Sequence, residues 1–363
     1  MSAARTLSAP LPPGATIGIL GGGQLGRMLA LAAARLGLKA HIYSDETESC
    51  AFLVASETTR AHYDDGEALA AFASGCDVVT FEFENVPEAT VQRLASHVAV
   101  APNARSLAIA QDRYLEKSFV AGLGIATAEF RDVQSGSDAR AAFKALGSPA
   151  ILKTRKLGYD GKGQKLVRSE GEAEAAFAAF GVSCILEQLV DFTFESSVVA
   201  ARGRDGTFAA YDPPKNEHEH HILRRSTVPA PLSKQMRDEA VAIARRIAEA
   251  LDYVGVLGVE LFVGKDGRIA VNEIAPRVHN SGHWTIEACV VSQFEQHIRA
   301  VAGWPLGDPD RHSDAVMENI IGAEVEQWQA LSHEKAGLHI YGKRFARPGR
   351  KMGHITRLFP LST

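Results

Sequence analysis

The chain has 363 residues, 46% of them hydrophobic and 23% charged, which is the composition of an ordinary soluble protein with room for two or three domains. Its formal net charge of −4, without a basic stripe interleaved with aromatic residues, argues against polymeric nucleic acid as a partner. No uncharged run approaches the roughly 20 residues that span a bilayer, and the four cysteines lack Cys-x-x-Cys spacing, so we expect a cytoplasmic protein with reduced thiols and no membrane partner.

The N-terminal part of the chain predicts a Rossmann-like domain. Residues 1–13 contain three prolines but no apolar segment of the kind found in signal peptides, so they are expected to form a flexible tail. A buried strand at 16–20, a helix at 24–36 and a second strand at 39–44 follow in order. A third strand is expected at 77–81. This alternation of strands and helices is typical of a parallel sheet.

A glycine-rich turn joins the first strand to the first helix. Gly21, Gly23 and Gly26 match the G-x-G-x-x-G fingerprint of dinucleotide-binding proteins, and Asp45 stands about 20 positions further on. One interpretation is therefore an NAD-dependent oxidoreductase. The other is a Rossmann-like half-domain whose turn binds a different phosphate at the helix N-terminus.

Charged residues stand at two places after the third strand. Glu82 and Glu84 come after the third strand and share one face, at the sheet edge where open α/β proteins bind ligands; a solvated strand end is the alternative. A helix at 113–121 then carries Arg113 and Lys117 four positions apart, which is the usual pattern of a solvated face.

Residues 153–164 predict a flexible flap over a polyphosphate. Two short strands, at 149–152 and 165–168, flank this stretch. Glycines allow backbone N–H groups to turn toward a ligand, and cations match its charge. The alternative is a basic, solvated hairpin. The glycines and cations are Gly158, Gly161, Gly163, Lys153, Arg155, Lys156 and Lys162.

Carboxylates and histidines follow the flap. A strand at 184–188 contains Glu187, and Glu195 comes shortly after it. The polar segment 212–225 holds three histidines, which could indicate a metal site. Acidic neighbours and the lack of a second cluster favour an exposed loop or a ligand contact instead. The histidines are His218, His220 and His221.

A predicted hairpin brings two carboxylates together. Apolar strands are expected at 254–263 and 268–274, joined by a two-residue turn at Asp266-Gly267. That turn would pair residue 265 with 268 and, counting back along both strands, Glu260 with Glu273. Two carboxylates about 5 Å apart on one face repel each other, so they call for a cation. Oxygen ligands favour Mg²⁺ or Mn²⁺. In the alternative, a longer turn directs one of the two toward solvent.

The loop at 275–284 is crowded with hydrogen-bonding and cationic side chains, and it directly follows the strand of Glu273. It is therefore well placed to hold a substrate. One apolar helix is expected at 285–301, and it could supply a dimer face. A small β unit with five cations between residues 343 and 351 ends the chain; these form either a solvated surface or a phosphate clamp.

Two long motifs carry a family resemblance. Gly158 to Gln164 and Asn272 to Thr285 closely resemble the 5-(carboxyamino)imidazole ribonucleotide synthases of the ATP-grasp superfamily. Shorter segments agree: 22–28, 81–85, 253–256 and 347–354. The resemblance covers roughly residues 15–360. Ala275 stands where many ATP-grasp enzymes have an asparagine that ligates the metal, which agrees with the narrower family.

The resemblance implies an ATP-grasp fold of α/β and α+β parts, with an N-terminal Rossmann-like domain and a small C-terminal β unit. It implies a homodimer and ATP-dependent carboxylation of 5-aminoimidazole ribonucleotide by bicarbonate, through carboxyphosphate. The expected parts are a tail at 1–14, a Rossmann-like domain at 15–111, a lid subdomain at 112–190, a metal-binding subdomain at 191–303 and a C-terminal β domain at 304–363.

The resemblance also assigns residues to the site, with Glu260 and Glu273 as the metal ligands. The residues expected at ATP are Arg113, Lys153, Gly158, Tyr159, Asp160, Gly161, Lys162, Gly163, Gln164, Glu187, Gln188, Leu189, Val190, Glu195, His218, Asn272 and Glu273. Those expected at the ribonucleotide are Gly23, Gln24, Leu25, Glu82, Arg277, Arg350 and Lys351. Those expected to act in catalysis are Lys153, Tyr159, Asp160, Lys162, Arg277, Asn280 and His283.

Two alternatives stay open. Another ATP-grasp carboxylase or ligase would share the nucleotide site and use a different acceptor; biotin carboxylase has a longer chain and a biotin partner. An NAD-dependent oxidoreductase would explain the glycine turn, but it would leave the flap and the pair Glu260 and Glu273 without a role.

Overall fold

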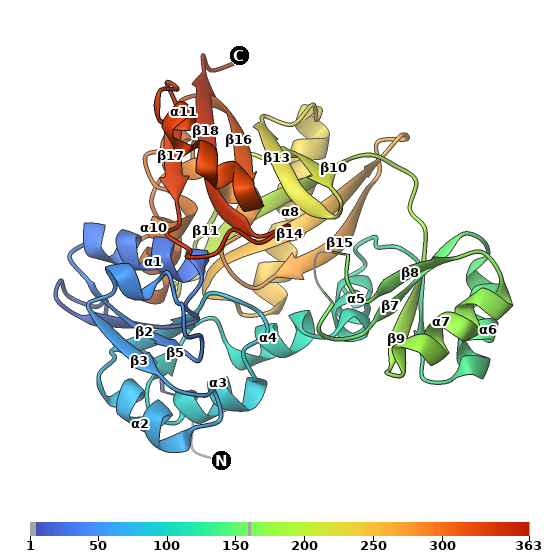
Figure 1. The fold of residues 1–363 in the computed structure, drawn as a ribbon, viewed down its shortest axis with the longest axis horizontal. Coiled ribbons are helices and arrows are strands. Elements are labelled where there is room, and N and C mark those ends of the chain that lie inside the picture. Colours follow the sequence, from blue (N-terminus) through green and yellow to red (C-terminus); the bar gives the residue numbers. More distant parts are fainter. Residues whose placement is uncertain (1–4, 159–160, 363) are drawn as a thin grey trace.

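The computed structural model describes residues 5–158 and 161–362. Within them the strands form three sheets, arranged as a Rossmann-like domain, a lid and a large central sheet (Figure 1). No helix in the described part of the chain is long and apolar enough to cross a membrane.

The N-terminal sheet is parallel, with strand order β3-β2-β1-β4-β5. Its side chains alternate between two cores because successive residues of a strand point to opposite faces. Ile17 and Ile19 pack with helix α1, whereas Leu20 and Phe81 face the side of α2 and α3. The elements are β1 (Thr16–Leu20), α1 (Gln24–Arg35), β2 (Lys39–Ser44), β3 (Glu57–Arg60), α2 (Gly66–Ser74), β4 (Val78–Phe81), α3 (Glu88–Ala95) and β5 (Ala99–Val100).

The lid is an antiparallel sheet of order β6-β9-β7-β8 with two helices beside it, and it projects to the right in Figure 1. Its small core includes Phe143, Leu152 and Leu186. The elements are β6 (Phe130–Val133), α6 (Gly136–Leu146), β7 (Ala150–Thr154), β8 (Gln164–Val167), α7 (Glu170–Phe180) and β9 (Cys184–Gln188). Helices α4 (Ala104–Ala110) and α5 (Arg113–Gly122) connect the Rossmann-like domain to it.

The large sheet has the order β15-β14-β10-β12-β13-β16-β18-β17, and β11 pairs with β10. Helix α8 covers one face and α10 the other, so that Val198 and Ala200 of β10 face α8 while Val199 and Ala201 face α10. The elements are β10 (Phe192–Arg202), β11 (Phe208–Ala210), β12 (Lys215–Glu219), β13 (Ile222–Val228), α8 (Lys234–Ala250), β14 (Gly255–Gly264), β15 (Ile269–Ala275), α9 (Thr285–Ala288), α10 (Gln293–Val301), β16 (Asp314–Ile321), α11 (Trp328–Ser332), β17 (Gly337–Ile340) and β18 (Lys351–Phe359).

The C-terminal strands continue this sheet, because β16 pairs with β13 of the central subdomain. Val228 lies opposite Ala315, and Ser226 lies opposite Met317. Figure 1 shows the C-terminal strands beside β13 and above the Rossmann-like domain. The domain boundaries given above stay a prediction.

Three expectations for local structure are wrong. The helix expected at 285–301 is two helices, α9 and α10, because the chain is extended at Cys289 and Ser292 caps a new start by accepting from Glu295 N at 3.3 Å. Helix α10 packs inside the chain against α1, so it offers no dimer face. The segment 212–225, for which an exposed loop or a ligand contact was expected, is not a loop but forms most of the hairpin of β12 and β13, and the ligand contact stays a prediction.

Candidate active site

Glu260 and Glu273 lie directly opposite each other on β14 and β15, as the sequence predicted. The predicted turn is nevertheless wrong. Gly264 N donates to Arg268 O at 2.9 Å, so three residues rather than two form the loop. A β-bulge lies between the pair of Glu260 and the pair of Leu261, and Asn272 is its extra residue. The longer loop and the bulge shift the register in opposite directions, and the carboxylates therefore still face each other.

The two carboxyl groups differ in their electrostatics. Burial opposes the charged form of Glu260, but the hydrogen bond from His279, whose Nε2 lies 3.1 Å from Glu260 Oε1, lowers its pKa. Asn272 Nδ2 donates to the other oxygen at 3.4 Å. The negative charge of Glu260 raises the pKa of Glu273. Two oxygen donors whose repulsion a cation would relieve suit Mg²⁺, which completes its shell with water and phosphate. Within the described residues, no group of three or more histidine, cysteine, aspartate or glutamate side chains could hold a metal ion.

Helix α5 contributes buried charges that the sequence analysis interpreted as a solvated face. Lys117 is only 2% exposed, and its Nζ lies 3.1 Å from Asn272 O and 3.6 Å from Glu187 Oε2. Glu116 accepts from Ile274 N at 2.6 Å. The interpretation of Lys117 as solvated is therefore wrong. Spacing on a helix cannot show that a second element covers that face.

Glu187 is the centre of a buried ion network in the lid. Lys153 Nζ donates to Glu187 Oε2 at 2.8 Å. Burial opposes the charged form of Glu187, but the charges of Lys153 and Lys117 outweigh it and lower its pKa. The second oxygen, Oε1, is buried and has no hydrogen-bond partner among the described residues. An acceptor held in this way is ready for a donor on a ligand.

The flap begins beside helix α5 and reaches the hairpin of β12 and β13. Arg113 donates to Gly158 O at 3.2 Å. Gly161 has a φ of +77°, and a Cβ there would lie 2.5 Å from the ring of His221. Gly163 O accepts from Thr154 N at 2.8 Å. Lys162 and Gln164 belong to this segment, whereas the predicted site residues Tyr159 and Asp160 lie outside the described residues.

His218 and Glu195 form a pair on neighbouring strands, with His218 Nδ1 2.6 Å from Glu195 Oε2. Burial lowers the pKa of His218, but the hydrogen bond that it donates to Glu195, together with the negative charges of Glu195 and Glu260, outweighs burial, so the pKa is raised. His220 and His221 lie at the hairpin turn with positive φ values. The other predicted ATP residues, Gln188, Leu189 and Val190, end β9 and follow it; Leu189 is 43% exposed.

The glycine turn of the Rossmann-like domain is occupied by a carboxylate of the chain itself. Glu82 accepts from Gly23 N and Gly26 N at the N-terminus of α1. Burial raises the pKa of Glu82. A dinucleotide would place its pyrophosphate at these N–H groups, so this arrangement disfavours the oxidoreductase interpretation. Gln24 and Leu25, also predicted for the ribonucleotide, begin the same helix.

Arg277 pairs with Glu84, which was not among the predicted site residues. Arg277 Nη2 donates to Glu84 Oε1 at 3.0 Å. Burial opposes the charged form of Glu84, but Arg277 lowers its pKa to about 2. The pair joins the Rossmann-like domain to the loop after β15, over 193 residues of sequence.

The basic C-terminal segment lies close to Glu82. Lys343 Nζ donates to Lys351 O at 2.8 Å. Burial lowers the pKa of Lys343 to about 8, Glu82 opposes this shift, and the charges of Arg350 and Lys351 add to it. The predicted cations Arg350 and Lys351 thus gather around Lys343, within electrostatic range of the glycine turn.

Asn280 and His283 occupy different surroundings. Both polar atoms of the Asn280 side chain are buried and have no hydrogen-bond partner within the described parts of the chain. His283 is 1% exposed, lies 3.1 Å from Gln293 Nε2 through its Nδ1, and contacts the ring of His354 at 4.9 Å. Burial lowers the pKa of His283 well below its usual range. His279 contacts Glu260 and was not predicted; its place between Arg277 and Asn280 gave no separate signal.

Comparisons with known proteins cover most of the chain. Residues 14–111 match the model of the ribonucleotide synthetase preATP-grasp domain, 118–294 that of the ATP-grasp domain, and 315–360 that of the phosphoribosylaminoimidazole carboxylase C-terminal domain. The N5-carboxyaminoimidazole ribonucleotide synthase of Brucella melitensis is 53% identical over 96% of this chain and 98% of its own length.

Two solved structures extend the likeness to the fold. An ADP complex of purK, an N5-carboxyaminoimidazole ribonucleotide synthetase, superposes with a TM-score of 0.93 at 40% identity, covering 97% of this chain and 94% of the other. The N5-carboxyaminoimidazole synthase of Aspergillus clavatus, in complex with ADP and 5-aminoimidazole ribonucleotide, has a TM-score of 0.87 at 31% identity, covering 96% and 94%.

Proposed function

This chain belongs to the family of N5-carboxyaminoimidazole ribonucleotide synthases, and we propose that it performs the reaction of that family, the ATP-dependent carboxylation of 5-aminoimidazole ribonucleotide in purine biosynthesis. The observation that carries this proposal is a similarity that extends along all three parts of the chain. Residues 315–360 match the phosphoribosylaminoimidazole carboxylase C-terminal domain, and this match favours 5-aminoimidazole ribonucleotide over the acceptors of other ATP-grasp enzymes.

ATP would bind where the lid faces the large sheet. The unpartnered Oε1 of Glu187 would accept a hydrogen bond from the adenine amine, and Glu195, held by His218, would accept from the ribose hydroxyl groups. Lys153 and Lys162 would neutralise phosphate charge, because phosphoryl transfer depends on positioning and electrostatic stabilisation. The remaining predicted ATP residues form the flap, the end of β9 and β15.

Glu260 and Glu273 would hold Mg²⁺, with Mn²⁺ as an alternative, and Asn272 would stand beside them. The ion would neutralise charge on the phosphates of ATP. The raised pKa of Glu273 supports this proposal, because a bound cation removes the repulsion that raises it.

Bicarbonate is the carboxyl donor in this proposal. One of its oxygens would attack the γ-phosphorus of ATP, giving carboxyphosphate and ADP. The exocyclic amine would then attack the carboxyl carbon of carboxyphosphate and displace phosphate, or it would attack CO₂ after carboxyphosphate has broken down to CO₂ and phosphate. In both routes the phosphate takes the proton that the amine loses. The buried, unpartnered amide of Asn280 supports a small polar ligand near Arg277. His283, which is buried behind this loop, would help to position the bicarbonate or CO₂. Carboxyphosphate hydrolyses readily, so the glycine flap would exclude water.

The ribonucleotide would bind between the glycine turn and the basic C-terminal segment. Its phosphate would meet Arg350 and Lys351, with Lys343 beside them. Gly23, Gln24, Leu25 and Glu82 would contact the rest of the molecule. We also propose a homodimer, which sedimentation would test, and a cytoplasmic location, where ATP is available.

The experiment that tests the function measures ADP formation with Mg-ATP and bicarbonate, with and without 5-aminoimidazole ribonucleotide. Strong stimulation by the ribonucleotide is expected. ADP formation that does not respond to it would point to another acceptor on the same ATP-grasp site. No ADP formation would overturn the proposal.

A further inference from the structure

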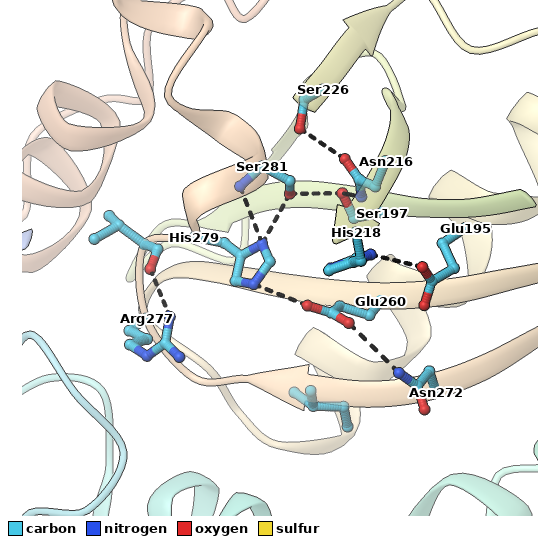
Figure 2. Close-up of polar contacts among 12 residues, drawn as sticks. Glu195, Ser197, Asn216, His218, Ser226, Glu260, Asn272, Arg277, His279 and Ser281 are labelled. Carbon is cyan, nitrogen blue, oxygen red and sulfur yellow. Dashed lines mark hydrogen bonds and ion pairs between the residues drawn. The ribbon is translucent and has the colours of Figure 1, made fainter. Parts of the chain in front are cut away.

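Four buried polar side chains run in single file through the large sheet to His279 (Figure 2). Ser226 Oγ donates to Asn216 Oδ1 at 2.8 Å, and Asn216 Nδ2 donates to Ser197 Oγ at 2.9 Å. Ser197 Oγ lies 2.6 Å from Ser281 Oγ, which lies 2.8 Å from His279 Nδ1. We call Ser226, Asn216, Ser197 and Ser281 the buried relay.

The relay is fully enclosed. Its three serines are 0% exposed and Asn216 is 5% exposed. The four residues come from β13, β12, β10 and the short turn after β15, and no solvent separates them. Burying hydroxyl and amide groups costs free energy that apolar side chains of the same size would avoid, and full hydrogen bonding only offsets that cost. Packing alone therefore does not account for these residue types.

The protons of the relay can be placed from its donors. The amide nitrogen of Asn216 can only donate, so Ser197 Oγ accepts from it. Ser281 Oγ is the one other partner of Ser197 Oγ within the described residues, so it accepts the hydroxyl proton of Ser197. Ser281 then donates to His279 Nδ1. The backbone N–H of Ser281 also points to Nδ1, at 3.4 Å, which requires Nδ1 to be an acceptor.

The other ring nitrogen must then carry the proton in neutral His279. Nε2 lies 3.1 Å from Glu260 Oε1, so its N–H donates to the carboxylate. The other oxygen of this carboxylate, Oε2, is not used by His279 and accepts from Asn272 Nδ2 at 3.4 Å. Partners behind a ligating group commonly fix its orientation in this way.

We propose that Ser226, Asn216, Ser197 and Ser281 are positioning residues that hold His279 as the Nε2–H tautomer and thereby orient the carboxylate of Glu260. The catalytic consequence rests on the proposed function, since Glu260 acts there at the phosphates of ATP. The hydrogen-bond arrangement itself does not depend on that function.

The tautomer can be measured without nucleotide or metal. Protein labelled with ¹⁵N in its histidines would be examined by NMR, with the His279 signals assigned by their loss in His279→Gln. The Nε2–H form is expected in the wild type. Asn216→Asp replaces the donor with an acceptor of the same shape, so Ser197 and Ser281 must reverse their hydroxyl protons. His279 is then expected to carry a proton on Nδ1.

Kinetics give a second, independent result. Ser281→Ala removes the side-chain donor to Nδ1, and we expect kcat for ADP formation to fall about tenfold with little change in KM for ATP. Should Asn216→Asp not fold, Ser281→Ala also serves as the variant for the NMR test, and a mixture of the two His279 tautomers is then expected. Ser196→Ala is the matched control, because Ser196 is 1% exposed and donates to Pro214 O at 2.8 Å. It loses the same kind of bond on the opposite face of β10.

Opposite results would overturn the proposal. His279 carrying its proton on Nδ1 in the wild type would exclude the relay, as would Ser281→Ala matching Ser196→Ala in both tautomer and kcat. A wild-type protein that forms no ADP would instead overturn the proposed function, while the NMR result would still decide the relay.

Discussion

Glu273 carries a charge that its neighbour Glu260 makes unfavourable, and this cost is visible in its raised pKa. Binding sites commonly contain such unfavourable charges, because a bound ligand removes the repulsion. Lys343 shows the same principle with the opposite sign: burial disfavours its positive charge, and an anionic substrate would favour it.

Glu273→Gln is expected to lower ADP formation by at least about a hundredfold, because the amide cannot supply the negative charge that holds a cation. The fold is expected to survive with an unchanged or higher melting temperature, since the repulsion from Glu260 disappears. Steady-state ADP assays and thermal unfolding would check both points. Turnover close to that of the wild type would contradict the metal assignment.

The lowered pKa of Lys343 predicts that binding of the ribonucleotide depends on pH. A lysine is a cation below its pKa and neutral above it, so its attraction for phosphate is present below about pH 8 and is lost as the pH rises through that value. KM for the ribonucleotide is therefore expected to increase between about pH 7 and 9.5.

Lys343→Arg is the control for this prediction, because arginine stays charged over the whole range. Its KM should remain nearly constant with pH. The same increase in Lys343→Arg as in the wild type would show that another group titrates.

At the scale of elements, two features connect the lid to the large sheet. Helix α5 uses Lys117 to contact both Glu187 of the lid and Asn272 of β15. The flap approaches the turn of β12 and β13 through Gly161. The lid therefore meets the sheet through a buried ion pair on one side and a glycine contact on the other.

Gly161→Ala is expected to raise KM for ATP several-fold. Alanine at a φ of +77° is strained by roughly 1 kcal/mol, and its Cβ would collide with His221. Gly171→Ala in α7 is a suitable control, because that glycine has no positive φ and nothing within 4 Å of the added Cβ. Equal kinetics for the two variants, measured by ADP release, would remove the role of the flap contact.

For the whole molecule, the C-terminal strands are part of the central sheet. Ala315 and Met317 of β16 are fully buried and share one core with Ile19 and Val199. Three distant parts of the chain therefore meet in a single hydrophobic core, and we expect them to fold together.

A chain ending at residue 313 tests this expectation. Its loss of β16 would expose the long edge of β13 and uncover the shared core, so we predict aggregation rather than a soluble fragment. Soluble yield and circular dichroism would measure the outcome. A soluble fragment with cooperative unfolding would show that residues 314–363 form an independent domain.

Features that depend on local spacing could be predicted from the order of residues alone. The glycine turn at Gly21 to Gly26, the flap around Gly158 and the strands of Glu260 and Glu273 could all be read from residue type and period. The family followed from two such motifs and is confirmed by the comparisons. The facing carboxylates were predicted correctly through a turn that is one residue too short, because the bulge at Asn272 compensates.

The contacts between distant groups became known from the packing of the folded chain. Lys117 is buried against Glu187 and Asn272, Glu82 fills the glycine turn, and His279 lies between Glu260 and Ser281. Lys117 and Glu82 have partners that are far away in sequence, and His279 lies in a loop without a regular period, so neither the 3.6-residue nor the two-residue period records these contacts. Periodicity shows which face of an element is apolar, whereas the packing of separate elements determines which polar groups that face encloses.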